Sequence, residues 1–348
     1  MVPTVSESFV VELPHAHGRP RLKGRLRAAP EDFQVREELS FTLDGAGEHV
    51  WLWVRKRDAN TEWVARRLAQ RAGVAAGAVG YAGLKDRHAL TEQWFSVHLP
   101  GRPEPDWSVA EGDEFSVLEA VRHSRKLRRG ALSGNAFRIV AREIEGQPEE
   151  LAERLRRVAA NGAPNYFGEQ RFGREGGNLE RAEALLRGEE QVRDRHRRGL
   201  YLSAARAALF NAVLARRIAR SDWSQPLPGE VLMLDGSHSI FTATEPDAAI
   251  RQRVADLDLH PTGPLWGAGE LLSEGEAREL EQAVAATLPV FRDGLAAEGL
   301  RQERRALRLR VQDAALEWSD SKTAVLNFRL TAGVYATAVL RELIQATD

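Results

Sequence analysis

The sequence predicts an α+β fold in which a helical segment interrupts a sheet-forming domain. Three observations lead to this prediction. Apolar and polar residues alternate around Phe95, Val97 and Leu99, as a half-buried strand requires. The apolar period changes to 3.6 residues after Glu149, and strand-like alternation returns at 324–330. The order sheet, helices, sheet therefore indicates a helical domain inserted into a discontinuous α+β domain.

In the first part of the chain, residues 49–54 are mostly aromatic or β-branched, which favours a strand. Further strands are expected near 115–117 and 137–139. After residues 49–54 and before the strand around Phe95, a helix is expected that is capped by Asn60 or Thr61 and stopped by Gly73.

The middle of the chain is expected to be helical. Apolar residues in 151–158 lie on one helix face, and 161–164 ends that helix. Asn178 and Ser203 are expected to cap further helices, and proline and glycine residues at 225–229 and 261–269 to separate later ones. After the final strand, an apolar helix is expected to follow Gly333.

Composition limits the class of protein. The 348 residues are 43% hydrophobic and 28% charged, as in an ordinary globular protein. Neither an apolar run of membrane-spanning length nor a signal peptide is present, so we expect a cytoplasmic protein that does not bind membranes. The absence of cysteine excludes disulfides, thiolate nucleophiles, and zinc–thiolate and iron–sulfur sites.

The formal net charge of −1 conceals two clusters of positive charge. No acidic residue occurs from Ala120 to Arg142, and Asp194 alone interrupts a second cluster. The cations of the two clusters are Arg122, Arg125, Lys126, Arg128, Arg129, Arg138 and Arg142, and then Arg193, Arg195, Arg197 and Arg198. Such clusters can simply solvate a surface, but two of them favour a polyanionic partner.

Motifs for common cofactors are absent. The glycine-rich stretch 173–177 lacks the Gly-Lys-Ser/Thr of a P-loop, and the nine histidines show no metal-ligand spacing. No Gly-x-Ser-x-Gly nucleophile elbow occurs either. We therefore expect chemistry that uses side chains and substrate alone, without a metal or a cofactor.

One candidate for this chemistry is Asp86, which lies between Lys85 and Arg87 after Gly80 and Gly83. The flanking cations favour an ionised carboxylate, which is the form that a covalent nucleophile requires. From these local features alone, an ordinary surface turn is the favoured explanation of Asp86.

The segment Gly83-Leu84-Lys85-Asp86-Arg87-His88-Ala89-Leu90-Thr91-Glu92-Gln93 resembles the signature of the TruD family of pseudouridine synthases. Similar blocks follow the same order along nearly the whole chain. They are 30–33, 126–137, 164–173, 203–206 and 332–337.

This resemblance implies a pseudouridine synthase fold with a mixed or antiparallel sheet and an inserted, mostly helical TRUD domain. The implied catalytic domain is discontinuous and covers 1–162 and 310–348, and the insertion covers 163–309. The implied reaction is the isomerisation of uridine 13, in the D-arm of tRNA, by an aspartate nucleophile acting on a flipped base. Whether this carboxylate attacks C1′ or C6, or acts through a glycal, stays open.

The resemblance transfers the nucleophile to Asp86. The residues expected to bind substrate are Arg27, Phe33, Lys85, Asn135, Phe137 and Tyr335. Two of these depart from the family, which commonly has lysine at position 27 and phenylalanine at 335. Residue type alone leaves core packing open for the two phenylalanines and a turn for Asn135.

No protein partner is evident, and we expect a monomer that acts on tRNA. Two alternatives use the same features. A non-catalytic RNA-binding protein or RNA chaperone would use the basic clusters without needing Asp86, and a metal-dependent nuclease would need clustered carboxylates.

Overall fold

The structure is a computed structural model that describes residues 13–110 and 114–347, and these form two compact units. We call them the sheet unit, comprising 21–110, 114–155, 311–333 and 344–347, and the helical unit, comprising 13–20, 156–310 and 334–343. Each unit is built from segments distant in sequence, because the chain passes between the units several times. The predicted α+β class is confirmed.

The sheet unit contains a ten-stranded sheet within the described residues. Its main order is β14-β15-β7-β2-β5-β3-β6, with β1 beside β7 and β16, and β4 beside β5. Two pairs, β2 with β5 and β1 with β16, are parallel and the others antiparallel, so the sheet is mixed. The strands are β1 Lys23–Leu26, β2 Phe33–Glu38, β3 His49–Arg57, β4 Val79–Tyr81, β5 Leu90–His98, β6 Phe115–His123, β7 Gly134–Glu145, β14 Gln312–Trp318, β15 Ala324–Thr331 and β16 Gln345–Thr347.

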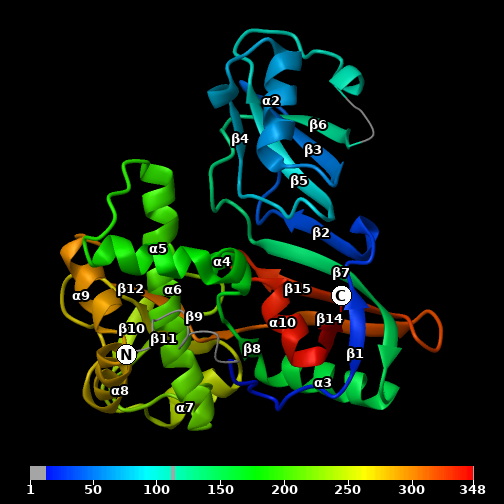
Figure 1. Ribbon diagram of the computed structural model, residues 1–348. Helices are drawn as coiled ribbons and strands as arrows, with labels where there is room; N and C mark the ends of the chain where they lie inside the picture. The colour runs from blue at the N-terminus through cyan, green and yellow to red at the C-terminus, as the bar shows by residue number, and fades with distance from the viewer. Residues whose placement is uncertain (1–12, 111–113, 348) are drawn as a thin grey trace. The chain divides into compact units, whose positions relative to one another are not determined.

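Helix α2, Thr61–Ala72, covers one face of the β3–β5–β6 part of this sheet (Figure 1). Its apolar stripe includes Val64 and Leu68, which are fully buried and share a core with strand residues such as Phe95. Gly73 ends the helix with φ of 61°, as expected for a glycine C-cap. Asn60 is the N-cap, but its side chain makes no capping hydrogen bond.

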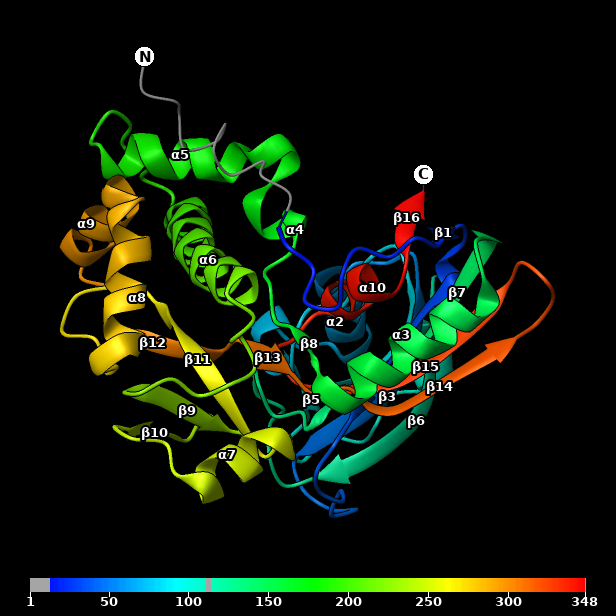
Figure 2. The same cartoon turned by 90° about the horizontal axis from the view of Figure 1, so that it is seen from below.

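In the helical unit, a four-stranded sheet of order β10-β9-β11-β12 packs against α6 and α8 (Figure 2). A separate two-stranded pair joins β8 to β13. The strands are β8 Ala163–Pro164, β9 Glu230–Leu234, β10 Ile240–Ala243, β11 Leu259–Leu265, β12 Glu303–Ala306 and β13 Arg308–Leu309. The helices are α4 Glu169–Phe172, α5 Gly177–Leu186, α6 Arg195–Ala219, α7 Ala248–Ala255, α8 Gly275–Ala286, α9 Pro289–Ala297 and α10 Ala336–Leu343, and α3, Pro148–Asn161, belongs partly to each unit.

Several local predictions in this region are wrong. Asn178 and Ser203 lie inside α5 and α6, whose N-caps are Gly176 and Asp194. Asp194 accepts hydrogen bonds from two backbone N–H groups of the first turn, which a serine nine residues later could not reach. Much of 261–269 belongs to β11 rather than to a break between helices.

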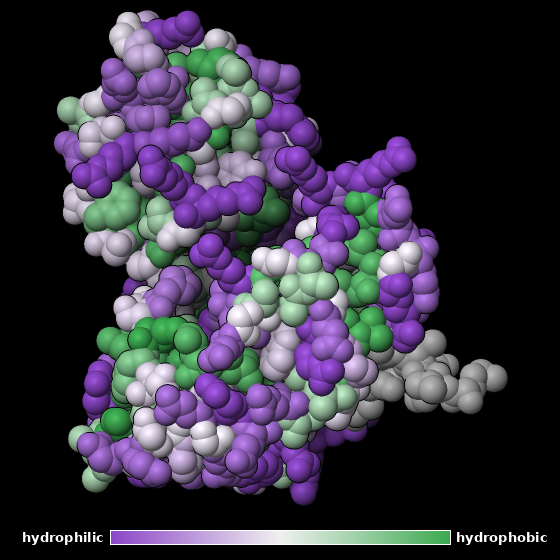
Figure 3. Space-filling model, turned by 90° about the vertical axis from the view of Figure 1, so that its left-hand side faces the viewer, coloured by the Kyte–Doolittle hydropathy of each residue, from purple (hydrophilic) through white to green (hydrophobic). Residues whose placement is uncertain are grey.

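None of the helices in the described residues is long and apolar enough to cross a membrane. In the space-filling view, hydrophilic side chains dominate the visible face and apolar side chains form only small patches between them (Figure 3).

Candidate active site

Asp86 lies in the loop between β4 and β5, where two short contacts orient its carboxylate. Its Oδ2 pairs with Arg27 Nη1 at 2.8 Å, and its Oδ1 accepts a hydrogen bond from the backbone N–H of His88 at 3.1 Å. The side chain is 26% exposed. An ionised carboxylate held by a cation and still open to solvent can act as a nucleophile.

Arg27 follows β1 and has φ of 63°, a left-handed conformation that is unfavourable for a residue with a side chain. Such outliers persist where the surrounding contacts fix them, and they concentrate at functional sites. Here the guanidinium makes two contacts. It pairs with Asp86, and its Cζ lies 4.1 Å from the centroid of the Phe33 ring, within cation–π range.

Phe33 and Phe137 lie on the same sheet face and meet edge to face, with ring centroids 6.3 Å apart. Phe137 also stacks on Phe328, at 5.4 Å. The three rings come from β2, β7 and β15, and all three are buried within the structure. Core packing and a role as an aromatic wall beside Arg27 are thus compatible for both predicted phenylalanines.

Asn135 lies on β7 directly opposite Glu37 of β2, and therefore on the same face as Phe33 and Phe137. Its Oδ1 is buried and has no hydrogen-bond partner among the described residues. An unsatisfied buried acceptor costs about 1–3 kcal/mol, which a bound donor would recover. Asn135 lies inside strand β7, so the alternative that it forms a turn is wrong.

The ammonium of Lys85 pairs with the buried carboxylate of Glu37, whose other oxygen accepts from the backbone N–H of Trp94 at 2.8 Å. Burial raises the pKa of Glu37, while the neighbouring Lys85 charge opposes this rise. Lys85 is only 9% exposed. Its side chain is therefore engaged inside the sheet unit, and contact with substrate stays a prediction.

Tyr335 belongs to the helical unit. The residue is 39% exposed, and its hydroxyl accepts a hydrogen bond from Arg171 Nη2 at 2.8 Å. Arg171 in turn donates from Nη1 to Ser203 Oγ at 3.0 Å. The Tyr335 hydroxyl thus has a partner within the protein.

Three buried polar residues beside Asp86 were missed by the sequence reasoning. They are Lys56 at 0% exposure, Thr61 at 2% and Gln93 at 0%. A signal was available for the first, because Val50, Leu52, Val54 and Lys56 share the inward face of β3 by strand periodicity. A charge at an inward position is the feature that could have identified it.

The basic clusters are only partly available to a ligand. Arg122 pairs with Glu104, Arg142 with Asp32, and Arg198 with Glu298. The residues that remain exposed include those of the basic loop, 124–133 between β6 and β7, whose exposed cations are Arg125, Lys126, Arg128 and Arg129. Three arginines near the start of α6 are also exposed, namely Arg193, Arg195 and Arg197.

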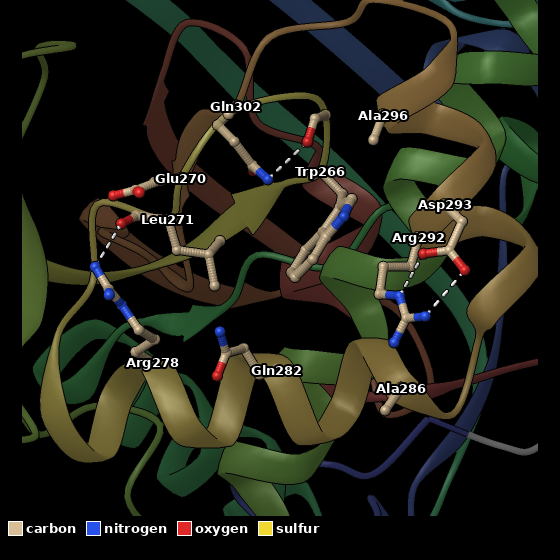
Figure 4. A pocket seen from close by; sticks show the side chains of 12 residues that line it. Trp266, Glu270, Leu271, Arg278, Gln282, Ala286, Arg292, Asp293, Ala296 and Gln302 are labelled. Carbon is tan, nitrogen blue, oxygen red and sulfur yellow. Dashed lines mark hydrogen bonds and ion pairs between the residues drawn. The ribbon is translucent and has the colours of Figure 1, made fainter.

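No group of three or more potential metal-ligating side chains occurs within residues 13–110 and 114–347. A pocket of about 650 Å³ lies in the helical unit beside Trp266 and contains none of the predicted site residues (Figure 4). Its polar side chains bond mainly to each other or to backbone, as in the Arg292–Asp293 pair and the bond from Arg278 to the Leu271 carbonyl.

The fold matches that of a solved structure. A crystal structure from Methanosarcina mazei, assigned as a tRNA pseudouridine synthase D, superimposes with a TM-score of 0.75. The match covers 99% of this chain and 98% of the other at 24% sequence identity. This likeness shows that the chain has a pseudouridine synthase fold, as predicted.

The sequence comparisons identify the family. The family model for tRNA pseudouridine synthase D (TruD) matches residues 14–192 and 178–343. The tRNA pseudouridine synthase D of Nitrosococcus oceani is 52% identical over 333 residues, covering 94% of this chain and 92% of the relative. That of Xanthomonas campestris is 50% identical over 349 residues, covering 97% and 95%. The chain belongs to the TruD family of tRNA pseudouridine synthases, and the predicted isomerase class is confirmed.

Proposed function

We propose that this chain converts uridine 13, in the D-arm of tRNA, to pseudouridine, and that Asp86 is the nucleophile. The observation that carries the proposal is the Asp86 carboxylate, ion-paired to Arg27 at 2.8 Å and partly open to solvent. Family membership supplies the reaction class, and the geometry supplies one carboxylate that is ion-paired to a cation and partly open to solvent.

In this reaction the N1–C1′ glycosidic bond breaks, a C5–C1′ bond forms, the proton on C5 is released to solvent, and N1 takes up a proton from solvent. The Asp86 carboxylate acts as the nucleophile that holds a covalent intermediate while the detached uracil turns. The exchange uses only substrate and side chains, so it balances without an oxidant or reductant.

The uridine must leave its stack to reach a carboxylate in a protein loop. Phe33 and Phe137 provide aromatic surface on the face that carries Asn135, and the free Oδ1 of Asn135 can accept a hydrogen bond from uracil N3–H. Arg27 holds the Asp86 carboxylate in place through their ion pair. Tyr335 is assigned to the substrate by family resemblance, with its ring as the contacting part.

The proposal includes the remaining predictions on organisation. The catalytic domain comprises 1–162 and 310–348, and 163–309 is the inserted TRUD domain. The protein is a cytoplasmic monomer, and its exposed basic loop contributes phosphate contacts to tRNA.

The test is release of tritium from tRNA transcribed with C5-labelled uridine. We expect Asp86→Asn to release none above background while binding tRNA within about threefold of wild type. The control Asp106→Asn alters an exposed carboxylate of the same unit and is expected to keep full activity. A substrate with cytidine at position 13 is expected to release none.

Each alternative result has a definite meaning. Normal turnover by Asp86→Asn would exclude the nucleophile assignment. Binding without tritium release by the wild-type protein would favour the RNA-binding alternative. Strand cleavage that a chelator stops would favour the nuclease.

A further inference from the structure

Lys56 is a buried cation directly behind the Asp86 loop. It lies near the end of β3, is 0% exposed, and donates from Nζ to two backbone carbonyls, those of Ala59 at 2.8 Å and Asp86 at 2.9 Å. Among the described residues no carboxylate oxygen pairs with this ammonium. Burying a charge without a paired opposite charge is costly, so such a residue calls for a functional explanation.

Two further anchors hold the residue before Asp86. The backbone N–H of Lys85 donates to Thr61 Oγ1 at 3.1 Å, and its ammonium pairs with Glu37. Thr61 is fixed in turn, because its hydroxyl donates to Gln93 Oε1 at 3.0 Å. The two consecutive residues are therefore held from β3, from the first residue of α2 and from β2, through side chains that are almost fully buried.

Burial lowers the pKa of Lys56 from its ordinary 10.5 to about 8. The charged groups that face it are Asp86, Lys85, Asp58 and Glu37, of which Lys85 also lowers the pKa and the three carboxylates oppose the shift. Near neutral pH the amine is thus still protonated. Its charge is partly balanced by the same carboxylate that the proposed reaction uses.

We propose that Lys56 is a positioning residue for the reaction, which fixes the main chain at Asp86 and holds a positive charge behind its carboxylate. This inference rests on the proposed role of Asp86. Lys56 acts through Asp86, since its own Nζ is occupied by two backbone carbonyls. A misplacement of about 1 Å in a reacting group can lower a rate about 100-fold.

The test is Lys56→Met, which keeps roughly the volume of the side chain and removes its charge and its hydrogen-bond donors. We expect the single-turnover rate of tritium release to fall about 100-fold, with the Kd for tRNA within about threefold of wild type. The control is Lys322→Met, which removes the same charge from an exposed lysine of the same unit, outside the basic loop. A Lys56→Met enzyme as fast as the control would overturn the proposal.

A second measurement is the pH profile of the wild-type protein, whose result does not depend on how the variant folds. We expect the wild-type single-turnover rate to decrease as pH rises above about 8, where Lys56 loses its proton. Lys56→Met, at its lower rate, is expected to lack this decrease. At pH 9.5, about 1.5 pH units above the pKa of Lys56, nearly all of this amine has lost its proton. A wild-type rate that stays constant up to that pH would overturn the role of the charge.

Asp86→Asn in the same assay separates the two proposals. If Asp86→Asn is active, the proposed function fails. If Asp86→Asn is inactive and Lys56→Met equals wild type, only the positioning role of Lys56 fails.

Discussion

Replacing Lys56 by methionine is expected to remove a pH-dependent part of the stability of the sheet unit. The folded protein holds this amine with a pKa of about 8, against 10.5 when it is exposed in the unfolded chain. Between these values the unfolded chain binds a proton that the folded chain has released. The free energy of unfolding of the wild type therefore rises with pH across this window.

The magnitude follows from the size of the pKa change. At about 1.4 kcal/mol for each pH unit, Lys56 contributes a rise of at most about 3 kcal/mol between pH 8 and pH 10.5. At pH 7 the same burial penalty is relieved in Lys56→Met, but the carbonyls of Ala59 and Asp86 lose their donor at about 1–3 kcal/mol each. These effects oppose each other at pH 7, so the pH dependence is the informative quantity.

The assay is urea denaturation at several values from pH 7 to pH 10.5, followed by tryptophan fluorescence. Six of the eight tryptophans lie in the sheet unit, so this signal reports mainly on the unit that contains Lys56. Subtracting the unfolding free energy of Lys56→Met from that of wild type at each pH cancels groups that titrate alike in both. A difference that does not change with pH would refute the reasoning. For the control, the exposed Lys322→Met, the same subtraction is expected to give a difference that does not change with pH.

Three further predictions concern the site and its surroundings. Glu37→Ala is expected to cost about 3–5 kcal/mol in urea denaturation, because it leaves the Lys85 ammonium buried without its carboxylate; a loss no larger than that of the exposed Glu48→Ala would contradict this. Tyr335→Phe keeps the ring and removes only the hydroxyl that Arg171 contacts, so tritium release is expected to stay within about fivefold of wild type; a larger loss would assign the hydroxyl a direct role. Replacing the three arginines of the basic loop by glutamine is expected to reduce the slope of log affinity for tRNA against log salt by about 2–3, and an unchanged slope would remove this loop from the interface.

The parts of the fold that the sequence predicted well are those with strong periodicity. Phe95 and Val97 alternate with polar neighbours and lie in β5, and Gly73 ends α2 where only a residue that tolerates positive φ fits. Strand β11 was missed because Pro261, Gly263 and Pro264 are typical of a turn. Its sequence could not show that the strands on both sides would accept those residues.

The candidate site was predicted unevenly for a related reason. Family resemblance led to Asp86 and Arg27, and their ion pair agrees with a shared site. It gave no reason to select Lys56 or Thr61, which are buried through contacts between β3, α2 and the Asp86 loop. Such contacts join segments distant in sequence, so the pattern within one segment does not contain them.

The position of β7 in the sheet has a consequence for the synthesis of the chain. Its neighbour β2 precedes it, but its other neighbour, β15, is translated about 180 residues later, after residues 156–310 of the helical unit. At about 5–20 residues per second this interval lasts roughly 10–40 s. During that time one edge of β7 stays unpaired and can associate with other chains. Asn135, opposite Leu330 of β15, obtains its final surroundings only when β15 has paired. A nascent or C-terminally truncated chain should therefore be inactive and prone to aggregate. Chaperones at the ribosome should matter most in this interval.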